Sequence, residues 1–333
     1  MSAPILIAGL GAVGANAARQ LVDTPSVTRV YVTDGRRERI EQVMGALASP
    51  KVAAADMRDL PDDVEVVACA LPEDRDLPLA EFAVERGCAF TSAAEDADAI
   101  VQVLALHAAA EDAGARLVPG AGFAPGFSDV LAAHAASSFD QIDEIHVARV
   151  GTAGAASAAV MRHALRNRAA VAHRGVLHEV RPRGHELIWF PEPIGARDCT
   201  LVASGVALLA QAFPQAERID TRLAEMTAPP WMRRTPDEQW GAVRVECWGR
   251  QGSVEAPLIY GCVERTAVAA GMMLALSAAA VIGALDLQRR DVPYAGVFGV
   301  GQLLDPIPTL AECARRGLKA AVFEGLEQVG ARA

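Results

Sequence analysis

Three glycines near the start of the chain have the spacing of a phosphate-binding turn. Gly9, Gly11 and Gly14 directly follow an apolar run, Ile5–Ala8, and lead into a helix-forming stretch. In such a turn the first glycine makes the sharp bend, the second lets the backbone approach a pyrophosphate, and the third allows helix and strand to pack closely. The helix N-terminus then offers free N–H groups to the phosphates. The residues expected at the pyrophosphate are Gly9, Gly11, Ala12, Val13 and Gly14.

An acidic residue stands where such a site holds the adenosine ribose. Asp34 ends the next apolar run, twenty residues after Gly14, and a carboxylate there can accept hydrogen bonds from the ribose hydroxyls. A carboxylate also repels a 2′-phosphate and so favours NAD, whereas Arg36 and Arg37 just beyond it would attract the phosphate of NADP. We therefore expect NAD as the cofactor, with NADP as the alternative, and we expect Asp34 and Arg36 among its contacts.

Histidine is the side chain best suited to proton transfer near neutral pH, and six of the seven histidines fall between residues 134 and 185. Oxidation of an amine by hydride transfer requires the neutral amine, so a base near the substrate assists it. We select His163 as the candidate base, because Arg162 and Arg166 are four residues apart and would share the adjacent helix face, where they could hold a carboxylate. The alternative is a basic, solvated helix without a catalytic role.

Arginine, which binds carboxylates with a planar fork, is the expected substrate clamp. The chain has only two lysines, Lys51 and Lys319, so a lysine base or Schiff base in a central site is not expected. As a further clamp we select Arg149, which ends an apolar run and leads straight into Gly151-Thr-Ala-Gly154.

Composition excludes several classes of partner. The chain has 31 basic and 41 acidic residues, a net charge of −10, which argues against nucleic acid and against an anionic membrane surface. The six cysteines show neither CxxC pairs nor the Cys/His spacing of a zinc site, so we expect reduced, buried thiols and no metal. The first residues lack the basic segment of a signal peptide, and we expect a cytoplasmic protein.

One uncharged segment has the length of a membrane span. Thr266–Leu285 is twenty residues long, but its Ala- and Gly-rich composition favours a buried, closely packed helix. We expect a homo-oligomer, a dimer, in which this helix is a close-packing surface between subunits.

The elements that must position the glycine loop alternate regularly over the first 120 residues. Short apolar runs, typical of strands covered on both faces, alternate with helix-forming stretches, which is the pattern of a doubly wound parallel sheet. The expected strands are Pro4–Ala8, Arg29–Thr33, Val52–Ala54, Val64–Leu71, Cys88–Ser92 and Arg116–Val118. The expected helices are Val13–Val22, Arg37–Ala48, Leu77–Glu85 and Ala97–Ala113.

The pattern changes at a Gly- and Pro-rich corner, Gly120–Gly126, which leads into a helix that we expect Asp129 to cap. Longer and less regular segments follow, including a hairpin over Gly249–Gly252. Trp231 and Trp240 lie in a proline-broken segment that suits either a lid or ordinary packing.

We therefore predict an α/β protein of two domains. An N-terminal Rossmann domain with a doubly wound parallel sheet covers residues 1–123, and residues 264–333 return to it. A second, α+β domain for substrate binding and dimerisation covers residues 124–263.

The sequence resembles the saccharopine dehydrogenase family, which includes saccharopine reductases, lysine 6-dehydrogenases and carboxynorspermidine synthases. The likeness runs from the glycine loop through Val64–Pro72 and Phe90–Ser92 to the junction Gly120–Asp129. Saccharopine reductases and carboxynorspermidine synthases carry Asp before Pro-Gly in this junction, whereas Ala124 is similar to the lysine 6-dehydrogenase-like members. The late segment Gly296–Val300 departs from the family pattern.

The resemblance implies a Rossmann domain joined to an α+β domain, with amine or imine chemistry in the cleft between them. It also implies that Leu71 and Pro72 contact the cofactor. We expect an NAD(P)-dependent oxidoreductase acting on the CH–NH group of an amino acid or related amine. Two alternatives are an imine or carbonyl reductase of a specialised pathway and a non-catalytic protein that binds the dinucleotide to sense it.

Overall fold

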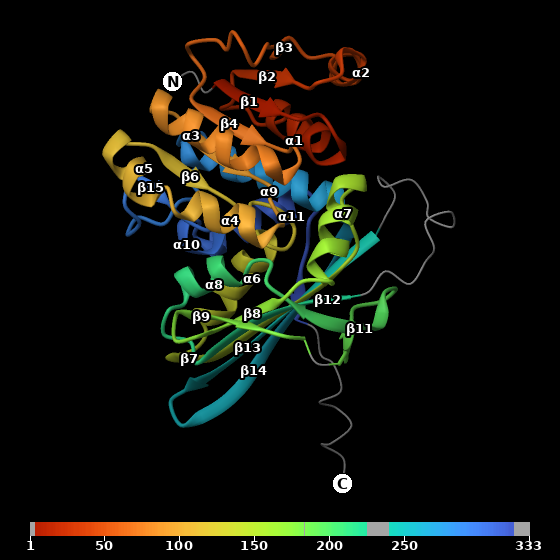
Figure 1. Ribbon diagram of the computed structural model, residues 1–333, viewed down its shortest axis with the longest axis vertical. Coiled ribbons are helices and arrows are strands. Elements are labelled where there is room, and N and C mark those ends of the chain that lie inside the picture. Colours follow the sequence, from red (N-terminus) through yellow and green to blue (C-terminus); the bar gives the residue numbers. More distant parts are fainter. Residues whose placement is uncertain (1–3, 183, 225–239, 323–333) are drawn as a thin grey trace.

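The computed structural model describes residues 4–182, 184–224 and 240–322, and Figure 1 shows two sheets with helices between and around them. The strands of the first sheet are β1 (Pro4–Ala8), β2 (Arg29–Thr33), β3 (Val52–Ala54), β4 (Val66–Cys69), β5 (Ala89–Ser92), β6 (Arg116–Val118) and β15 (Gly296–Val297). Their order is β15-β6-β5-β4-β1-β2-β3, and every pair is parallel. This is the predicted Rossmann sheet, with one late strand added at its edge.

Helices cover both faces of this sheet, as the continuous apolar strands require. They are α1 (Ala12–Val22), α2 (Arg37–Leu47), α3 (Asp76–Arg86), α4 (Ala97–Leu104) and α5 (His107–Ala113), with a short 3-10 turn, η1 (Glu73–Arg75). Along β1, Ile5 and Ile7 pack with α1 on one face, whereas Leu6 and Ala8 pack with α3 on the other. The two faces of the sheet are therefore covered by helices, and the candidate site lies at the carboxyl ends of the strands.

The predicted helix over Ala97–Ala113 is two helices in the structure, α4 and α5. The ring of His107, the first residue of α5, accepts a hydrogen bond from the Val297 backbone N–H at 3.1 Å. This contact ties α5 to β15, which lies 190 residues away in the sequence. A local reading of the sequence gives no indication of such a long-range contact.

The second sheet is mixed. Its strands are β7 (Gln141–Val150), β8 (Ala169–His173), β9 (Val176–Val180), β10 (Glu186–Phe190), β11 (Gly195–Val202), β12 (Arg218–Ala224), β13 (Trp240–Gln251), β14 (Val254–Arg265) and β16 (Ala321–Val322). The main path is β10-β11-β12-β7-β13-β14-β16, and the β8–β9 hairpin attaches to β12. Only β7 and β12 pair in parallel among the described strands of this sheet. The predicted hairpin is confirmed as β13 and β14.

The remaining helices are α6 (Phe127–Ala136), α7 (Ala155–Ala164), α8 (Val206–Ala212), α9 (Thr266–Val281), α10 (Val300–Leu303) and α11 (Pro306–Arg315). In Figure 1, α7 stands between the two sheets, beside the carboxyl ends of the first-sheet strands. The chain after residue 264 contributes α9 and β15 to the first domain and β16 to the second sheet.

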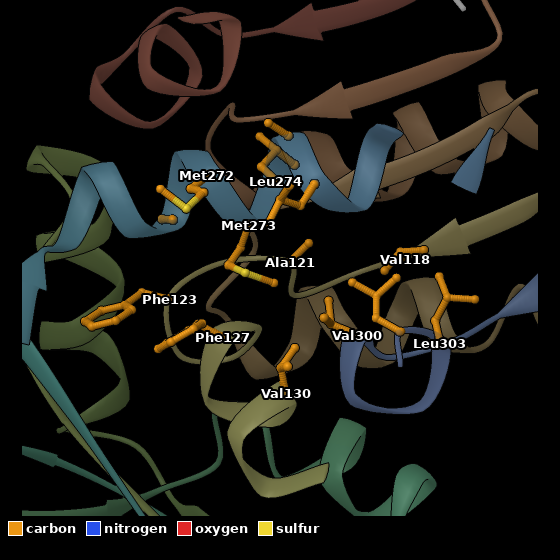
Figure 2. Packing of buried hydrophobic residues seen from close by; sticks show 14 of the residues in the cluster. Val118, Ala121, Phe123, Phe127, Val130, Met272, Met273, Leu274, Val300 and Leu303 are labelled. Carbon is orange, nitrogen blue, oxygen red and sulfur yellow. The ribbon is translucent and has the colours of Figure 1, made fainter. Parts of the chain in front are cut away.

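The uncharged helix α9 is enclosed by its own chain. Every residue of α9 except Val268 is buried, and Gly271 lies so close to α1 that a Cβ there would be 2.6 Å from the Asn16 Cβ. Figure 2 shows Met272 and Met273 of this helix above Phe123, which belongs to the Gly- and Pro-rich corner. The expectation that α9 packs between subunits is therefore wrong, because its surface is already used. No helix in the described part of the chain is long and apolar enough to cross a membrane.

Candidate active site

The glycine loop between β1 and α1 has the tight geometry that its sequence predicts. Gly9 has a positive φ of 94°, and a Cβ at Gly14 would lie 1.8 Å from the Gly9 carbonyl oxygen, so neither position accepts a side chain without movement. At Gly11, in contrast, a Cβ would meet nothing closer than the Arg39 Nη1 at 4.0 Å. Gly9 and Gly14 build the turn, and Gly11 leaves open space above it.

Asp34 closes the loop from the neighbouring strand. Its carboxylate accepts hydrogen bonds from the backbone N–H groups of Leu10, at 2.8 Å, and Arg36, at 2.9 Å. The Arg39 and Arg36 guanidinium groups lie 3.9 and 4.0 Å from the same carboxylate. The acid is thus held at the end of β2 with cations on its open side, which is compatible with a ribose and also with a nearby phosphate.

A hollow of about 580 Å³ opens over this loop. Every residue predicted to contact the cofactor lines it except Gly14, which lies beneath the loop. Sequence reasoning missed three parts of its wall: Arg39, Ala70 and the segment 153–157. That segment forms the N-terminus of α7 in the second domain. Gly151, just before it, and Gly154, within it, are the sequence signal that points to a turn there.

The described residues fit a nicotinamide dinucleotide. The cradle above Gly11 is open, the first turn of α1 presents backbone N–H groups that have no partner within a helix, and a carboxylate stands at the ribose position. Alanines and Ser157 from α7 face the loop from the other side of the hollow. The cofactor would therefore lie between the two domains.

A buried ion pair joins the domains next to this hollow. Glu95, which follows β5, and Arg149, near the end of β7, are each only 5% exposed. The Arg149 Nη1 lies 2.8 Å from the Glu95 Oε1, and Nη2 donates a longer hydrogen bond of 3.4 Å to Oε2. Ser157 of α7 donates to the Glu95 Oε2 at 2.7 Å. Three segments that are far apart in the sequence thus converge on one carboxylate.

A second hollow of about 470 Å³ lies on the other side of Glu95. Its walls combine apolar side chains with acidic ones from both domains, among them Ile100, Asp98 and Glu179. Because Ser157 lines the first hollow and Glu95 lines the second, the two adjoin at the Ser157–Glu95 hydrogen bond. The arrangement offers room for a cofactor and a substrate on either side of one buried carboxylate.

The structure separates the other predicted catalytic residues. His163 lines the second hollow, is exposed, and its Nε2 lies 2.6 Å from the Asn167 amide nitrogen. Arg162 is exposed and lines neither hollow. The helix ends at Ala164, so Arg166 lies in the following turn and does not share a helix face with Arg162 as predicted. Of the predicted group, His163 lines the second hollow, and Arg149 contacts Glu95, which also lines it.

Two carboxyl groups are buried in this part of the molecule. Asp76 lies near the carboxyl ends of the first-sheet strands, and Asp129 lies at the domain junction. Burial raises the pKa of Asp76 to about 6, although hydrogen bonds with Ser92 and Cys69 lower it. Burial raises the pKa of Asp129 to about 7, although hydrogen bonds from Ser128 and from the Gly126 backbone oppose this. Asp129 lies in the first turn of α6, whose cap position is Gly126, so it is not the N-cap residue, although its carboxyl group accepts a hydrogen bond from the Gly126 backbone.

Asp129 and Arg149 share the wall of a small internal cavity of about 10 Å³ between α6 and β7. The Asp129 Oδ2 is buried and has no hydrogen-bond partner among the described residues. A space of this size holds a single water at most. The buried acid therefore lies close to the ion pair without contacting it.

The histidines do not gather at the cleft. His146 lies three residues from Arg149 on β7, so its side chain points to the opposite face of the second sheet. Burial lowers its pKa, but the hydrogen bond and charge of Asp220 and the hydrogen bond of Glu144 raise it overall. His134 contacts the Tyr260 hydroxyl at 2.8 Å.

The cysteines and the tryptophans of the described ranges line neither of the two hollows. All six cysteines are free and buried, and burial raises the pKa of the Cys199 and Cys313 thiols to about 12. No cluster of three or more His, Cys, Asp or Glu side chains suited to a metal occurs in the described ranges. Trp231 lies outside the described residues. Trp240 is exposed, and the Arg265 guanidinium carbon lies over its ring, 5.8 Å from the centroid of the Trp240 ring.

Comparison with known proteins places the fold. No protein-family model matches the chain. Its structure is similar to apo saccharopine dehydrogenase (L-Glu forming) from Saccharomyces cerevisiae, with a TM-score of 0.66 and 13% identity over 96% of this chain and 100% of that chain. It is also similar to an amine dehydrogenase from Mycobacterium smegmatis, with a TM-score of 0.55 and 13% identity over 91% of this chain and 96% of that one.

A third similar structure is DAP dehydrogenase from C. glutamicum in complex with DAP, with a TM-score of 0.54 and 14% identity over 95% of this chain and 99% of that chain. At these identities the likeness establishes the fold and not the substrate. The chain therefore shares their fold, a Rossmann parallel sheet joined to a second domain with a mixed sheet.

Proposed function

We propose that this protein is an NAD(P)-dependent oxidoreductase that acts on the CH–NH group of an amino acid or related amine. The observation that supports it most is the meeting of two hollows, one over the glycine loop and one lined by both domains, at the Ser157–Glu95 contact. When bound, the nicotinamide ring would accept a hydride from the substrate or donate one to it. The names of the similar structures, a saccharopine, an amine and a DAP dehydrogenase, support an amine or amino-acid substrate.

Each part of the chain has a task in this proposal. The Gly11 cradle and the α1 N-terminus hold the pyrophosphate, and Asp34 holds the adenosine ribose. Leu71 and Pro72, which line the first hollow after β4, limit the space beside the dinucleotide. Arg149 is the carboxylate clamp, and His163 is a candidate for proton transfer at the rim of the second hollow. Closure of the two domains around the substrate excludes water from the reacting atoms.

A thermal-shift titration with NAD, NADH, NADP and NADPH tests the cofactor. A ligand at a hundred times its dissociation constant stabilises the folded protein by about 2.7 kcal/mol, which is easily measured. We expect a shift with NAD and NADH, after which amine oxidation and imine reduction are screened with that pair. If none of the four nucleotides raises the melting temperature, the proposal loses its basis.

The Asp34→Ala variant tests the preference for NAD over NADP. Removal of the carboxylate takes a hydrogen-bond acceptor from the ribose and a repulsive charge from a 2′-phosphate. We expect the Kd for NADH to rise by roughly tenfold and that for NADPH to change little or fall. Because Asp34 also binds the Leu10 and Arg36 backbone, Asp34→Asn serves as the control that keeps one acceptor oxygen. Equal changes for both nucleotides would contradict this assignment.

A further inference from the structure

We infer that Glu95 and Arg149 exchange partners when the substrate enters: the Arg149 guanidinium takes a carboxylate of the substrate, and the Glu95 carboxylate takes its ammonium group and then its proton. The inference rests on the proposed function and narrows it, because it assigns the substrate to the zwitterionic amino acids. It also gives a role to Glu95, which no sequence pattern marks.

The ion pair is fully buried yet incompletely bonded. Glu95 and Arg149 are each 5% exposed and belong to different domains. A guanidinium has five N–H donors in a planar fork and reaches its best geometry in two parallel bonds to a carboxylate. Here the Arg149 Nη1 lies 2.8 Å from Glu95 but makes no aligned hydrogen bond among the described residues, and Nη2 reaches Glu95 at only 3.4 Å. The guanidinium therefore has bonding capacity that its contact with Glu95 leaves unused.

The second hollow provides the route and the space. Glu95 forms part of its wall, and Ala203, Ala207 and Ile100 supply apolar surface beside the acid. At about 470 Å³ it is large enough for an amino acid with a side chain of several carbons. Ser157 lies on the opposite side of Glu95, where it lines the first hollow, the one over the glycine loop, which we call the nucleotide hollow. A substrate that reaches Glu95 from the second hollow therefore faces the cofactor.

The energetics of a buried ion pair select the class of ligand. Removing one partner from such a pair is costly because it leaves the other charge buried and uncompensated. An amine without a carboxylate would satisfy Glu95 and leave Arg149 alone, and a carboxylic acid without an amine would do the reverse. A zwitterion replaces both partners at once, so each buried charge keeps a counter-charge after the exchange.

The proton transfer balances within this set of groups. One N–H bond of the substrate ammonium breaks and one O–H bond forms at Glu95, which leaves a neutral amine, a neutral carboxyl group and the Arg149–carboxylate pair. The Ser157 hydroxyl holds the Glu95 Oε2 at 2.7 Å, so Oε1, the oxygen nearest to Arg149, is the one released by the exchange. Glu95 is thereby placed to receive the proton that must leave before the substrate carbon can release a hydride.

Matched probes test the exchange on the wild-type protein. Isothermal titration calorimetry, with the protein saturated by whichever reduced nucleotide binds, compares three amino acids with their decarboxylated and deaminated counterparts. The sets are norleucine, pentylamine and hexanoate; leucine, 3-methylbutylamine and 4-methylpentanoate; and phenylalanine, 2-phenylethylamine and 3-phenylpropanoate, so that each counterpart carries one charge only. We expect at least one amino acid to bind ten or more times more tightly than both of its counterparts. Equal binding of a counterpart in every set, or no binding by any probe, overturns the inference.

The variant Glu95→Gln/Arg149→Met removes both charges with little change in volume, so no unpaired charge is left to disturb folding. We expect it to bind the reduced nucleotide as the wild type does and to lose the preference for the amino acid. If the pair served only to hold the domains together, all probes would weaken equally and the preference would survive, which overturns the inference. If the nucleotide itself does not bind the wild type, the proposed function fails first, and the two failures are distinguishable.

Discussion

The nucleotide hollow and the Glu95–Arg149 cluster differ in how the chain builds them. The glycine loop and Asp34 come from two short segments, each directly after a parallel strand, and most of the contacts that we propose for the nucleotide there are made by the backbone. The cluster comes from side chains of three segments that span more than sixty residues and two domains. One region depends on local backbone geometry and the other on long-range pairing of buried charges, so they should respond differently to substitution.

The largest expected effect is in the charge cluster. Arg149→Met leaves Glu95 buried without its counter-charge, which typically costs about 3–5 kcal/mol of the free energy of unfolding. Urea denaturation followed by circular dichroism measures the loss. The substitution does not touch the glycine loop, so the variant should still bind the reduced nucleotide at a temperature where it is folded.

Glu95→Gln/Arg149→Met is the control for that experiment. Replacing both members of a buried pair with uncharged side chains is often neutral, so the double variant should be more stable than Arg149→Met alone. A single variant that loses less than about 1 kcal/mol would mean that water reaches the pair, and the contrast between the two regions would not hold.

The next effect concerns Asp129, the buried acid beside the cluster. Its pKa of about 7 lies above the value of 3.8 in an unfolded chain, so the unfolded state releases its proton first as the pH rises. This contribution to stability is complete below about pH 4 and is lost between there and pH 7. Asp129→Asn keeps an acceptor for Ser128 and cannot ionise, so it should be more stable than the wild type at pH 8, by at most about 4 kcal/mol, and equal at pH 4. Denaturation curves at the two pH values measure the difference, and a constant difference would contradict it.

Two glycine substitutions sharpen the picture of the nucleotide hollow. Gly14→Ala places a Cβ 1.8 Å from the Gly9 carbonyl oxygen and should cost about 1–3 kcal/mol of stability. Gly11→Ala meets no atom closer than 4.0 Å, so it should leave stability unchanged and weaken nucleotide binding by filling the cradle. Melting temperatures with and without NADH separate the two effects. Gly45→Ala, on the exposed face of α2 with open space around it, is the matched control and should be slightly stabilising.

These differences explain what the sequence could predict. The order of the parallel strands, the glycine loop and Asp34 follow from local patterns, because each depends on residues close together in the chain. Arg149 was selected for its place at a strand end, but Glu95 has no spacing signature and carries only one signal, its position shortly after the carboxyl end of β5. The role of segment 153–157 depends on how the second domain docks, and the burial of α9 depends on its packing against α1. Neither is encoded in a short window.

The smallest expected effect on stability is that of His163→Ala. This variant also allows the two candidate bases, His163 and Glu95, to be compared. His163 is exposed, so His163→Ala should change the free energy of unfolding by less than about 0.5 kcal/mol. Its effect on kcat/KM for amine oxidation is the informative measurement. A positioned base contributes roughly 10²- to 10⁴-fold, so Glu95→Gln should lose at least a hundredfold and His163→Ala less than tenfold.

The exposed His178, which lies outside the second hollow, supplies the matched control, and His178→Ala should leave kcat/KM unchanged. A hundredfold loss in His163→Ala together with an active Glu95→Gln would move proton transfer to the rim of the hollow. The buried ion pair would then be a structural contact between domains, and the chemistry of the second region would depend on an exposed side chain of α7.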